Sequence, residues 1–429
     1  MLLETVRESI FHPELSIKHK QQPQDFTRHR KLSFSELVLF QLQKSIKSLQ
    51  LRLNEFSLRF EEMPSMTKSA YSQARQKLRH TVFIELDNKL TRHYYKLGGI
   101  KTWNNFRLLS VDGSRIVLPT SEEILDRFGG QRLPATNHHE ETILPQGYLS
   151  TCYDVLNELS LSAVLEKNHS YELELAKGHQ GVFQSSDVVL YDRHYASYEF
   201  IAWLSQLPSH FIIRCPRSTF REGIRVFEGG PWSRVVTLEA PGGIIKLLKS
   251  RGLPRTVTVR FVRVILPNGD IEVLVTSLLD LQIKQADFKE VYGFRWNIET
   301  YFSRIKVRLN LENFSGKSVE SIFQDLYSTL FVANLETVVT EDIDETLSQK
   351  KSTRYAQKIN KSVSYNLIKN QMFDLLFNPD ISVAEVLTQM TALLIQSPVQ
   401  IRPARQVERG KSGPYRKLRY HKTSKKICF

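Results

Sequence analysis

The sequence predicts an α/β protein: a mixed sheet with helices packed on it, an inserted β subdomain, and helical regions at both ends. Three observations carry this prediction. Short apolar runs typical of buried strands stand at residues 107–111, 187–191 and 211–214, with helical segments between them. Residues 215–277 have a β rhythm with no long helical stripe. The regions before and after this core have apolar residues at helical spacing.

The first hundred residues are basic and mainly helical in pattern. Pro13 and Pro23 interrupt the first segment, so we expect ordered helix to begin near Ser33, which precedes apolar residues at helical spacing. Farther on, Thr67 or Ser69 is expected to cap another helix. We therefore predict a helical N-terminal domain.

The helix after Thr67 has two interpretations that spacing alone leaves open. In one, it is the recognition helix of a small DNA-binding domain, with polar residues toward base edges or phosphates. These residues are Tyr71, Ser72, Gln73 and Arg75. In the other, it is a plain surface helix. Its basic residues Lys68, Arg75 and Lys77 are expected to be exposed.

Two of the apolar runs end in an aspartate. Asp112 follows the run at residues 107–111, and Asp192 follows the run at residues 187–191. We expect two buried strands, each delivering a carboxylate at its end. An aspartate after a strand is on its own more often a turn former, so these two gain weight only beside a third group.

The remaining elements follow in chain order. A hairpin around Asn157 and Glu158 is expected to pair with the first strand, and a helix is predicted at residues 171–177. A second hairpin is predicted with its turn at residues 267–269. Helical spacing resumes at residues 318–339. The last predicted helix begins with a capping box from Ser382 to Glu385.

A helix is also predicted over residues 292–306, which read YGFRWNIETYFSRIK. Polar groups within an arc of roughly 60° on this helix are Tyr292, Arg295, Glu299 and Lys306. The neighbouring arc of about 100° is an apolar stripe of Val291, Phe294, Ile298, Tyr301, Phe302, Ile305 and Leu309. One interpretation is a set of functional groups held along the edge of the core. The other is the solvated flank of an ordinary amphipathic helix.

Asp112, Asp192 and Glu299 together suggest a metal site. If the two strands are neighbours, their ends bring the aspartates close, and the helix carrying the glutamate can complete the cluster. Like charges at short range repel unless cations neutralise them, and hard oxygen ligands favour Mg²⁺ or Mn²⁺. Two such ions about 3.5–4 Å apart would suit phosphodiester displacement by water or a 3′-hydroxyl.

Charge and composition narrow the partners. The chain has 429 residues and a formal net charge of +14. Two or three structural units are therefore expected, with a polyanion as partner, either nucleic acid or an anionic membrane surface. No apolar run approaches the roughly 20 residues of a membrane span. Glu4 and Glu8 do not fit a signal peptide, so we expect an unexported protein. The three cysteines, Cys152, Cys215 and Cys428, match no zinc spacing.

These motifs resemble a known family. Aspartates in VDGSRIVLP and VVLYDRHYAS, followed by Tyr-x2-Arg-x3-Glu-x6-Lys, closely resemble the DDE transposases of bacterial insertion sequences, in the branch marked by the YREK signature. The four signature positions match at Tyr292, Arg295, Glu299 and Lys306. The resemblance covers roughly residues 105–315. One departure is His194, where the family usually has glycine or alanine.

The resemblance implies an RNase H-like catalytic core with two Mg²⁺ (or Mn²⁺) ions. It implies that Asp112, Asp192 and Glu299 are the metal ligands and that Tyr292, Arg295 and Lys306 grip DNA phosphates. The implied activity is nicking of double-stranded DNA at the terminal inverted repeats of the element, followed by joining of the 3′-hydroxyl ends to target DNA. The implied assembly is a synaptic homodimer in the bacterial cytoplasm, associated with the nucleoid.

With this resemblance the chain divides into six expected regions. They are a helical DNA-binding domain (1–100), the first part of the RNase H-like core (101–214), a β insertion (215–277), the second part of the core (278–340), a helical C-terminal region (341–401) and a basic tail (402–429). The tail carries ten lysines and arginines against one acid between Arg402 and Lys426, which favours phosphate contact over a merely solvated arm.

Two minor candidates have simpler explanations. Trp232 could stack on an unpaired base, but a tryptophan beside Gly-Gly-Pro is more often packed in a loop. The run His138, His139, Glu140 and Glu141 could in principle bind a metal. Contiguous side chains diverge, however, so an exposed loop is the better interpretation.

Two rival functions remain open. A domesticated transposase kept as a non-catalytic DNA-binding protein would be expected to have lost carboxylates. An RNase H-like nuclease without strand transfer explains the carboxylates but not the tyrosine, arginine and lysine of the signature.

Overall fold

The computed structural model describes residues 2–27, 32–45, 47–60, 65–135, 141–266, 268–349, 354–378 and 380–402. The chain divides into two compact units. Unit 1 comprises Met1–Gly98, Arg115–Gly147 and Ser303–Phe429, and unit 2 comprises Gly99–Ser114 and Tyr148–Phe302. His138, His139, Glu140, Cys428 and the basic tail beyond Arg402 lie outside the described residues.

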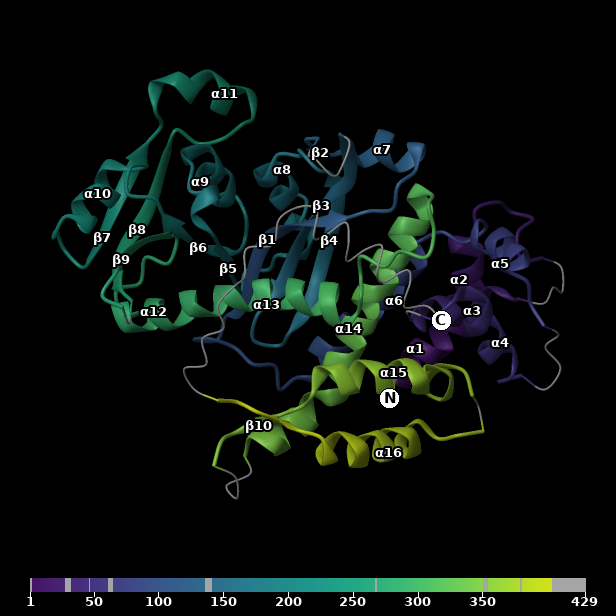
Figure 1. Cartoon of the computed structure of the whole chain (residues 1–429). Helices are drawn as coiled ribbons and strands as arrows, with labels where there is room; N and C mark the ends of the chain where they lie inside the picture. Colours follow the sequence, from purple (N-terminus) through teal and green to yellow (C-terminus); the bar gives the residue numbers. More distant parts are fainter. Residues whose placement is uncertain are drawn as a thin grey trace. The chain divides into compact units, whose positions relative to one another are not determined.

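Unit 2 is built on a mixed sheet with the strand order β4-β3-β1-β5-β6-β9-β8-β7 (Figure 1). The strands are β1 (Arg107–Val117), β3 (Thr142–Asp154), β4 (Leu159–Lys167), β5 (Asp187–Tyr191), β6 (His210–Cys215), β7 (Ser233–Glu239), β8 (Thr256–Ile265) and β9 (Ile271–Thr276). β1, β5 and β6 run parallel, and β9, β8 and β7 continue the sheet antiparallel. The predicted RNase H-like mixed sheet, with an opening hairpin beside the first strand, is confirmed.

Helices surround this sheet in chain order. They are α8 (Glu172–Lys177), α9 (Tyr198–Leu204), α10 (Arg221–Phe227), α11 (Ile245–Ser250), α12 (Gln285–Gly293) and α13 (Asn297–Ser303), with 3₁₀ turns at Gln180–Val182, Arg193–Tyr195, Gly242–Ile244 and Phe294–Trp296. The core between sheet and helices is made of fully buried side chains such as Val189, Phe200, Ile213, Phe261 and Val275. β5 is buried along its whole length, as expected for a strand covered on both faces.

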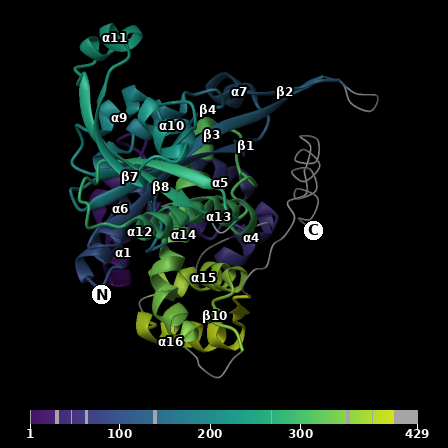
Figure 2. The ribbon, with the colours of Figure 1, turned by 90° about the vertical axis from the view of Figure 1, so that its left-hand side faces the viewer.

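The region predicted as a β insertion extends the central sheet. β9 pairs antiparallel with β6, placing Cys215 opposite Val273, and β7 and β8 form a long hairpin with α11 at its end (Figure 2). The expectation of no helix here is wrong, because α10 and α11 are present. They have only seven and six residues, too few for a clear helical period in the sequence.

Unit 1 is mainly helical. Its helices are α1 (Leu2–Phe11), α2 (Pro13–His19), α3 (Phe34–Leu42), α4 (Leu49–Ser57), α5 (Lys68–Arg75), α6 (Thr81–Leu97), α7 (Glu122–Phe128), α14 (Val319–Ser348), α15 (Lys361–Leu376) and α16 (Val383–Gln396), with a π-helical turn at Arg304–Arg308. Short strands β2 (Gly130–Leu133), β10 (Gln357–Lys358) and β11 (Val399–Gln400) complete it. The long helix α14 packs against α3, α6, α15 and α16, and α15 and α16 lie side by side (Figure 1).

The N-caps of unit 1 follow the sequence signals. Ser33 forms a capping box with Glu36 at the start of α3, and Ser318 and Ser382 cap α14 and α16. The prediction that ordered helix begins near Ser33 is wrong, however, because α1 and α2 precede it. Pro13 is the first residue of α2, a position where proline costs no hydrogen bond.

The helix α5 corrects another expectation. Thr67 caps it as predicted, but Tyr71 and Arg75 are only 2% and 6% exposed. Arg75 forms an ion pair of 2.9 Å with Asp325 on α14. Tyr71 and Arg75 therefore cannot face base edges or phosphates, and of the polar residues named for that role only Ser72 and Gln73 are exposed.

Candidate catalytic carboxylate site

The alignment of β1 and β5 is fixed by a buried ion pair. Arg107 and Asp187 lie directly opposite each other in the parallel register, and the guanidinium meets both carboxylate oxygens at 2.8 Å. Asp112 and Asp192 each follow five residues later along their strands. The register therefore brings both aspartates to the same edge of the sheet, as the sequence predicts.

Asp112 lies inside β1, because the strand continues to Val117; the expectation that the strand ends there is wrong. Its side chain is 20% exposed. The Oδ1 atom accepts a hydrogen bond of 2.8 Å from the Gly113 amide. Burial raises the pKa of Asp112 to about 6; the Gly113 amide and Arg295 oppose this rise, while Glu172 and Asp192 add to it. The site therefore disfavours an isolated negative charge at this position.

Gly113 is required by close packing. A Cβ atom at this position would lie 2.2 Å from the ring of Tyr148, far inside van der Waals contact. Only glycine lets the backbone beside Asp112 pass this aromatic ring. The Asp-Gly pair of the VDG motif thus has a steric reason, in addition to the carboxylate.

Asp192 follows β5 and caps the 3₁₀ turn at Arg193–Tyr195. Its Oδ1 atom accepts from the Arg193 amide at 2.7 Å, and its Oδ2 atom lies 3.5 Å from Nδ1 of His194. His194, where the resembling family has a small residue, is exposed, so its bulk causes no clash in this turn.

The helical segment over residues 292–306 is not one uniform α-helix. α12 ends at Gly293, a 3₁₀ turn spans Phe294–Trp296, α13 follows, and a π turn spans Arg304–Arg308. The predicted apolar stripe is nevertheless confirmed, because Val291, Ile298, Tyr301, Phe302, Ile305 and Leu309 are buried and Phe294 is half-buried. The 3₁₀ and π turns shift residues from ideal α positions, so the 60° arc expected from sequence does not describe the real geometry.

Arg295 lies between two of the carboxylates. Its Nη1 atom is 3.9 Å from Oδ2 of Asp112, and its Nη2 atom is 3.3 Å from Oε1 of Glu299. The guanidinium is 4% exposed and lies 4.6 Å from the centre of the Trp296 ring. Its Nε atom is buried without a hydrogen-bond partner. Arg295 therefore neutralises part of the cluster through contacts longer than the usual 2.7–2.9 Å of charge-assisted bonds.

The other two signature residues differ in surroundings. Tyr292 is buried; its hydroxyl donates to the Tyr191 carbonyl at 3.3 Å, and burial raises its pKa, so it remains a neutral phenol. Lys306 belongs to unit 1, where its ammonium donates to the Arg115 carbonyl at 2.6 Å. The structure thus joins Arg295 to Asp112 and Glu299 and gives Tyr292 and Lys306 backbone partners.

A fourth carboxylate was missed by the sequence analysis. Glu172, at the start of α8, accepts a hydrogen bond of 3.1 Å from the Tyr195 hydroxyl and is close enough to Asp112 to raise its pKa. No motif marks Glu172. The only available signal was its place at the start of a predicted helix.

The donor set fits a hard divalent cation in chemical type. Three carboxylates supply the oxygen ligands that Mg²⁺ and Mn²⁺ prefer, and burial around Asp112 disfavours leaving its charge uncompensated. In the part of the chain that the structure describes, however, no three acidic, histidine or cysteine side chains are gathered closely enough to hold an ion as they stand. The cation now among them is Arg295.

Sheet, carboxylates and signature together define the class of the protein. Residues 103–335, more than half of the chain, match the family model described as the transposase DDE domain, and the chain belongs to this family. Among known proteins it resembles the transposase InsG for insertion sequence element IS4 of Escherichia coli (strain K12), with 26% identity over 279 residues, 63% of this chain and 61% of that protein. The chain therefore spans less than two thirds of that relative.

A solved structure is also similar. The piggyBac transposase synaptic complex with hairpin DNA shares 11% identity and a TM-score of 0.45, covering 91% of this chain and 85% of that one. Among the described helices, none is long and apolar enough to cross a membrane. Cys152 and Cys215 are buried free thiols.

Proposed function

We propose that this protein is a transposase that binds the terminal inverted repeats of an insertion sequence, cleaves DNA at the element ends and joins the freed 3′-hydroxyl ends to target DNA. The observation that carries the proposal is the parallel register of β1 and β5, pinned by Arg107 and Asp187, which sets Asp112 and Asp192 at one sheet edge. Glu299 reaches the same group through Arg295.

In this proposal Asp112, Asp192 and Glu299 hold one or two Mg²⁺ or Mn²⁺ ions. When bound, these ions supply Lewis-acid activation of a water or 3′-hydroxyl and stabilisation of the leaving oxygen. The chain's own part is to hold the carboxylates in place: the Gly113 amide orients Asp112, and the Arg193 amide orients Asp192. Both carboxylates keep one oxygen without a short hydrogen bond, which leaves it available as a ligand.

Tyr292, Arg295 and Lys306 are proposed to contact phosphates near the cleaved end, which would place the protein in the branch marked by this signature. Two features of Arg295 support its part. Its contacts to the carboxylates are long, and its Nε atom is a buried donor without a partner. Such unsatisfied donors are rare in native structures and point to a missing partner. A phosphate could satisfy this donor and release the carboxylates for the metal.

The regional division predicted from sequence completes the proposal. We assign DNA-end binding to residues 1–100, catalysis to residues 101–214 and 278–340, and phosphate contact to the basic tail. The sequence's net charge of +14 supports a DNA partner. We further propose that the active assembly is a homodimer that pairs two element ends, associated with the nucleoid in the cytoplasm.

A cleavage assay tests the proposal. The substrate is a fragment that carries the element's own ends, incubated with Mg²⁺ and a target plasmid. Wild type is expected to nick the ends and join them, and Glu299→Gln to lose about a thousandfold or more in nicking rate while still binding the ends. Glu290→Gln is the matched control, because Glu290 is an exposed glutamate on α12.

The outcomes separate the rival functions. Binding without nicking by the wild type would favour a non-catalytic DNA-binding protein. Nicking without joining would favour a nuclease. Equal nicking by wild type and Glu299→Gln would place the chemistry elsewhere in the molecule.

A further inference from the structure

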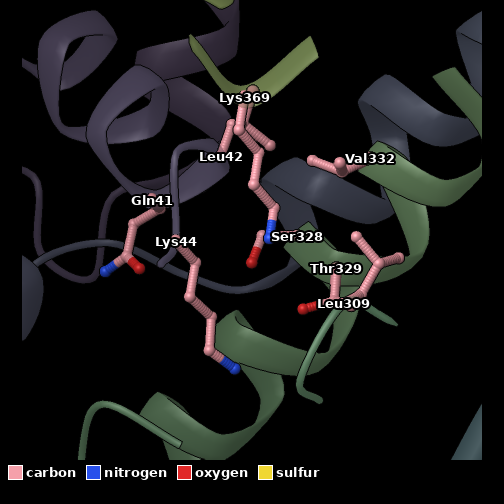
Figure 3. Close-up of a pocket in the computed structure, with 8 residues that line it drawn as sticks. All are labelled: Gln41, Leu42, Lys44, Leu309, Ser328, Thr329, Val332 and Lys369. Carbon is pink, nitrogen blue, oxygen red and sulfur yellow. The ribbon is translucent and has the colours of Figure 1, made fainter. Parts of the chain in front are cut away.

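A small cavity lies inside unit 1, among the ends of several helices. Its lining residues are Gln41, Leu42, Lys44, Leu309, Ser328, Thr329, Val332 and Lys369 (Figure 3). They come from α3 and the turn after it, the segment before α14, α14 itself and α15. Its volume is about 10 Å³ for the centre of a water-sized sphere, which is room for one particle of about that size.

Two lysine side chains point into this space. Figure 3 shows the Lys44 and Lys369 chains extending from different helical segments toward the same interior region. Lys44 is 6% exposed; its ammonium donates to the Leu311 carbonyl at 3.3 Å and lies 5.2 Å from the centre of the Phe314 ring. Lys369 has no hydrogen-bond or ion-pair partner among the residues that the structure describes.

The charges around the cavity do not balance. The cationic side chains in the neighbourhood are Lys44, Lys369, Arg52 and Arg75. The acid that acts on Lys44 is Asp325. That carboxylate already pairs with Arg75 at 2.9 Å and accepts hydrogen bonds from the amide and hydroxyl of Ser315. The interior therefore carries an excess of positive charge.

Burial has the expected effect on both ammonium groups. Loss of hydration lowers the pKa of Lys44 to about 8, and the same cause lowers the pKa of Lys369 to about 8. Mutual repulsion adds to the effect for Lys369, through Lys44 and Arg52. A buried ammonium without a partner is costly, so the fold gains if something negative joins it.

We propose that this cavity binds one small monovalent anion of chloride size, held between the ammonium groups of Lys44 and Lys369. The size argues against a phosphate or a nucleotide, because the cavity has room for one water-sized particle. A carboxylate side chain could have served the same purpose, but none lines the cavity. The neighbouring hydroxyl groups of Ser328 and Thr329 are engaged with the Asp325 carbonyl, so the two ammonium groups are the anion's main partners.

The bound anion links parts of unit 1 that are distant in sequence. Lys44 follows α3, Lys369 lies on α15, and the opposite wall is α14. An anion that binds only the folded state raises its stability in proportion to the logarithm of the anion concentration. Chloride is therefore expected to stabilise unit 1 specifically, beyond any general effect of salt.

Thermal unfolding of the full chain tests this inference. Sodium gluconate, whose anion is too large for the cavity, is replaced stepwise by sodium chloride at constant ionic strength. The midpoint of unfolding is expected to rise by about 2 °C or more and to saturate. Lys369→Met is expected to unfold at a higher midpoint than wild type in gluconate and to show no response to chloride. Lys96→Met, which removes an exposed lysine of α6, is expected to respond like wild type.

Either of two results would overturn the proposal: no chloride response in wild type, or an equal response in wild type and Lys369→Met. A crystal grown in bromide gives the direct readout. An anomalous peak is expected between Lys44 and Lys369, and an empty cavity with ordered bromide elsewhere would also reject the site.

Discussion

Two charged clusters of opposite sign differ in how they are compensated. In unit 2, Asp112, Asp192 and Glu299 are 20–30% exposed and share one buried cation, Arg295. In unit 1, buried cations surround one buried acid, Asp325, which is saturated by its neighbours. The first cluster opens to solvent and the second is enclosed.

The difference indicates different uses. Exposed carboxylates at the edge of a rigid sheet can exchange Arg295 for metal ions and a substrate phosphate, because the present contacts are long. Enclosed cations can only take a partner small enough to enter the helical packing. The same imbalance of charge therefore implies a reactive site in one unit and a stabilising ion in the other.

The strongest way to break the comparison is to remove the acid's partner in the enclosed cluster. Arg75→Met leaves Asp325 buried without its ion pair, so we expect a loss of about 3–5 kcal/mol in the free energy of unfolding. Chemical denaturation measures it. Arg59→Met is the control, because Arg59 meets Asp374 only at 3.9 Å on the surface, and it should cost no more than about 1 kcal/mol. Equal losses would show that enclosure does not matter.

The exposed cluster is expected to respond in the opposite direction. The raised pKa of Asp112 means that the folded protein keeps this proton up to about pH 6, while the unfolded chain has lost it. Stability should therefore fall as pH rises from about 4 to 6. In magnesium-free buffer at pH 8, Asp112→Asn is expected to be more stable than wild type by about 2 kcal/mol, with little difference at pH 4.

Urea unfolding at the two pH values checks this prediction. Magnesium should narrow the gap at pH 8, because a bound cation stabilises the ionised aspartate. A gap of the same size at pH 4 and pH 8 would mean that burial of the ionised group is not the cause.

The sequence predicted what local pattern determines. The buried runs before Asp112 and Asp192 have a clear period, and Ser33, Thr67 and Ser318 are local capping signals; the structure confirms these strands and caps. Arg75 was wrong for a reason of range, because its partner Asp325 lies 250 positions away, and spacing within α5 cannot reveal it.

The site shows the same limit. The order and spacing of the signature identified the residues around Glu299, but not the 3₁₀ and π turns that place them, nor the position of Arg295 between carboxylates. Glu172 carries no motif at all. Long-range packing decides such features, and one sequence does not encode them in any local period.

The central claim is that Asp112 ligates a catalytic metal ion, and a change of ligand tests it most directly. A thiolate binds Mn²⁺ better than the harder Mg²⁺. Nicking of the element ends by Asp112→Cys is therefore expected to be lost with Mg²⁺ and restored with Mn²⁺, while Asp112→Ala stays inactive with both. Nicking by Asp112→Cys at the same rate with Mg²⁺ as with Mn²⁺ would contradict the account.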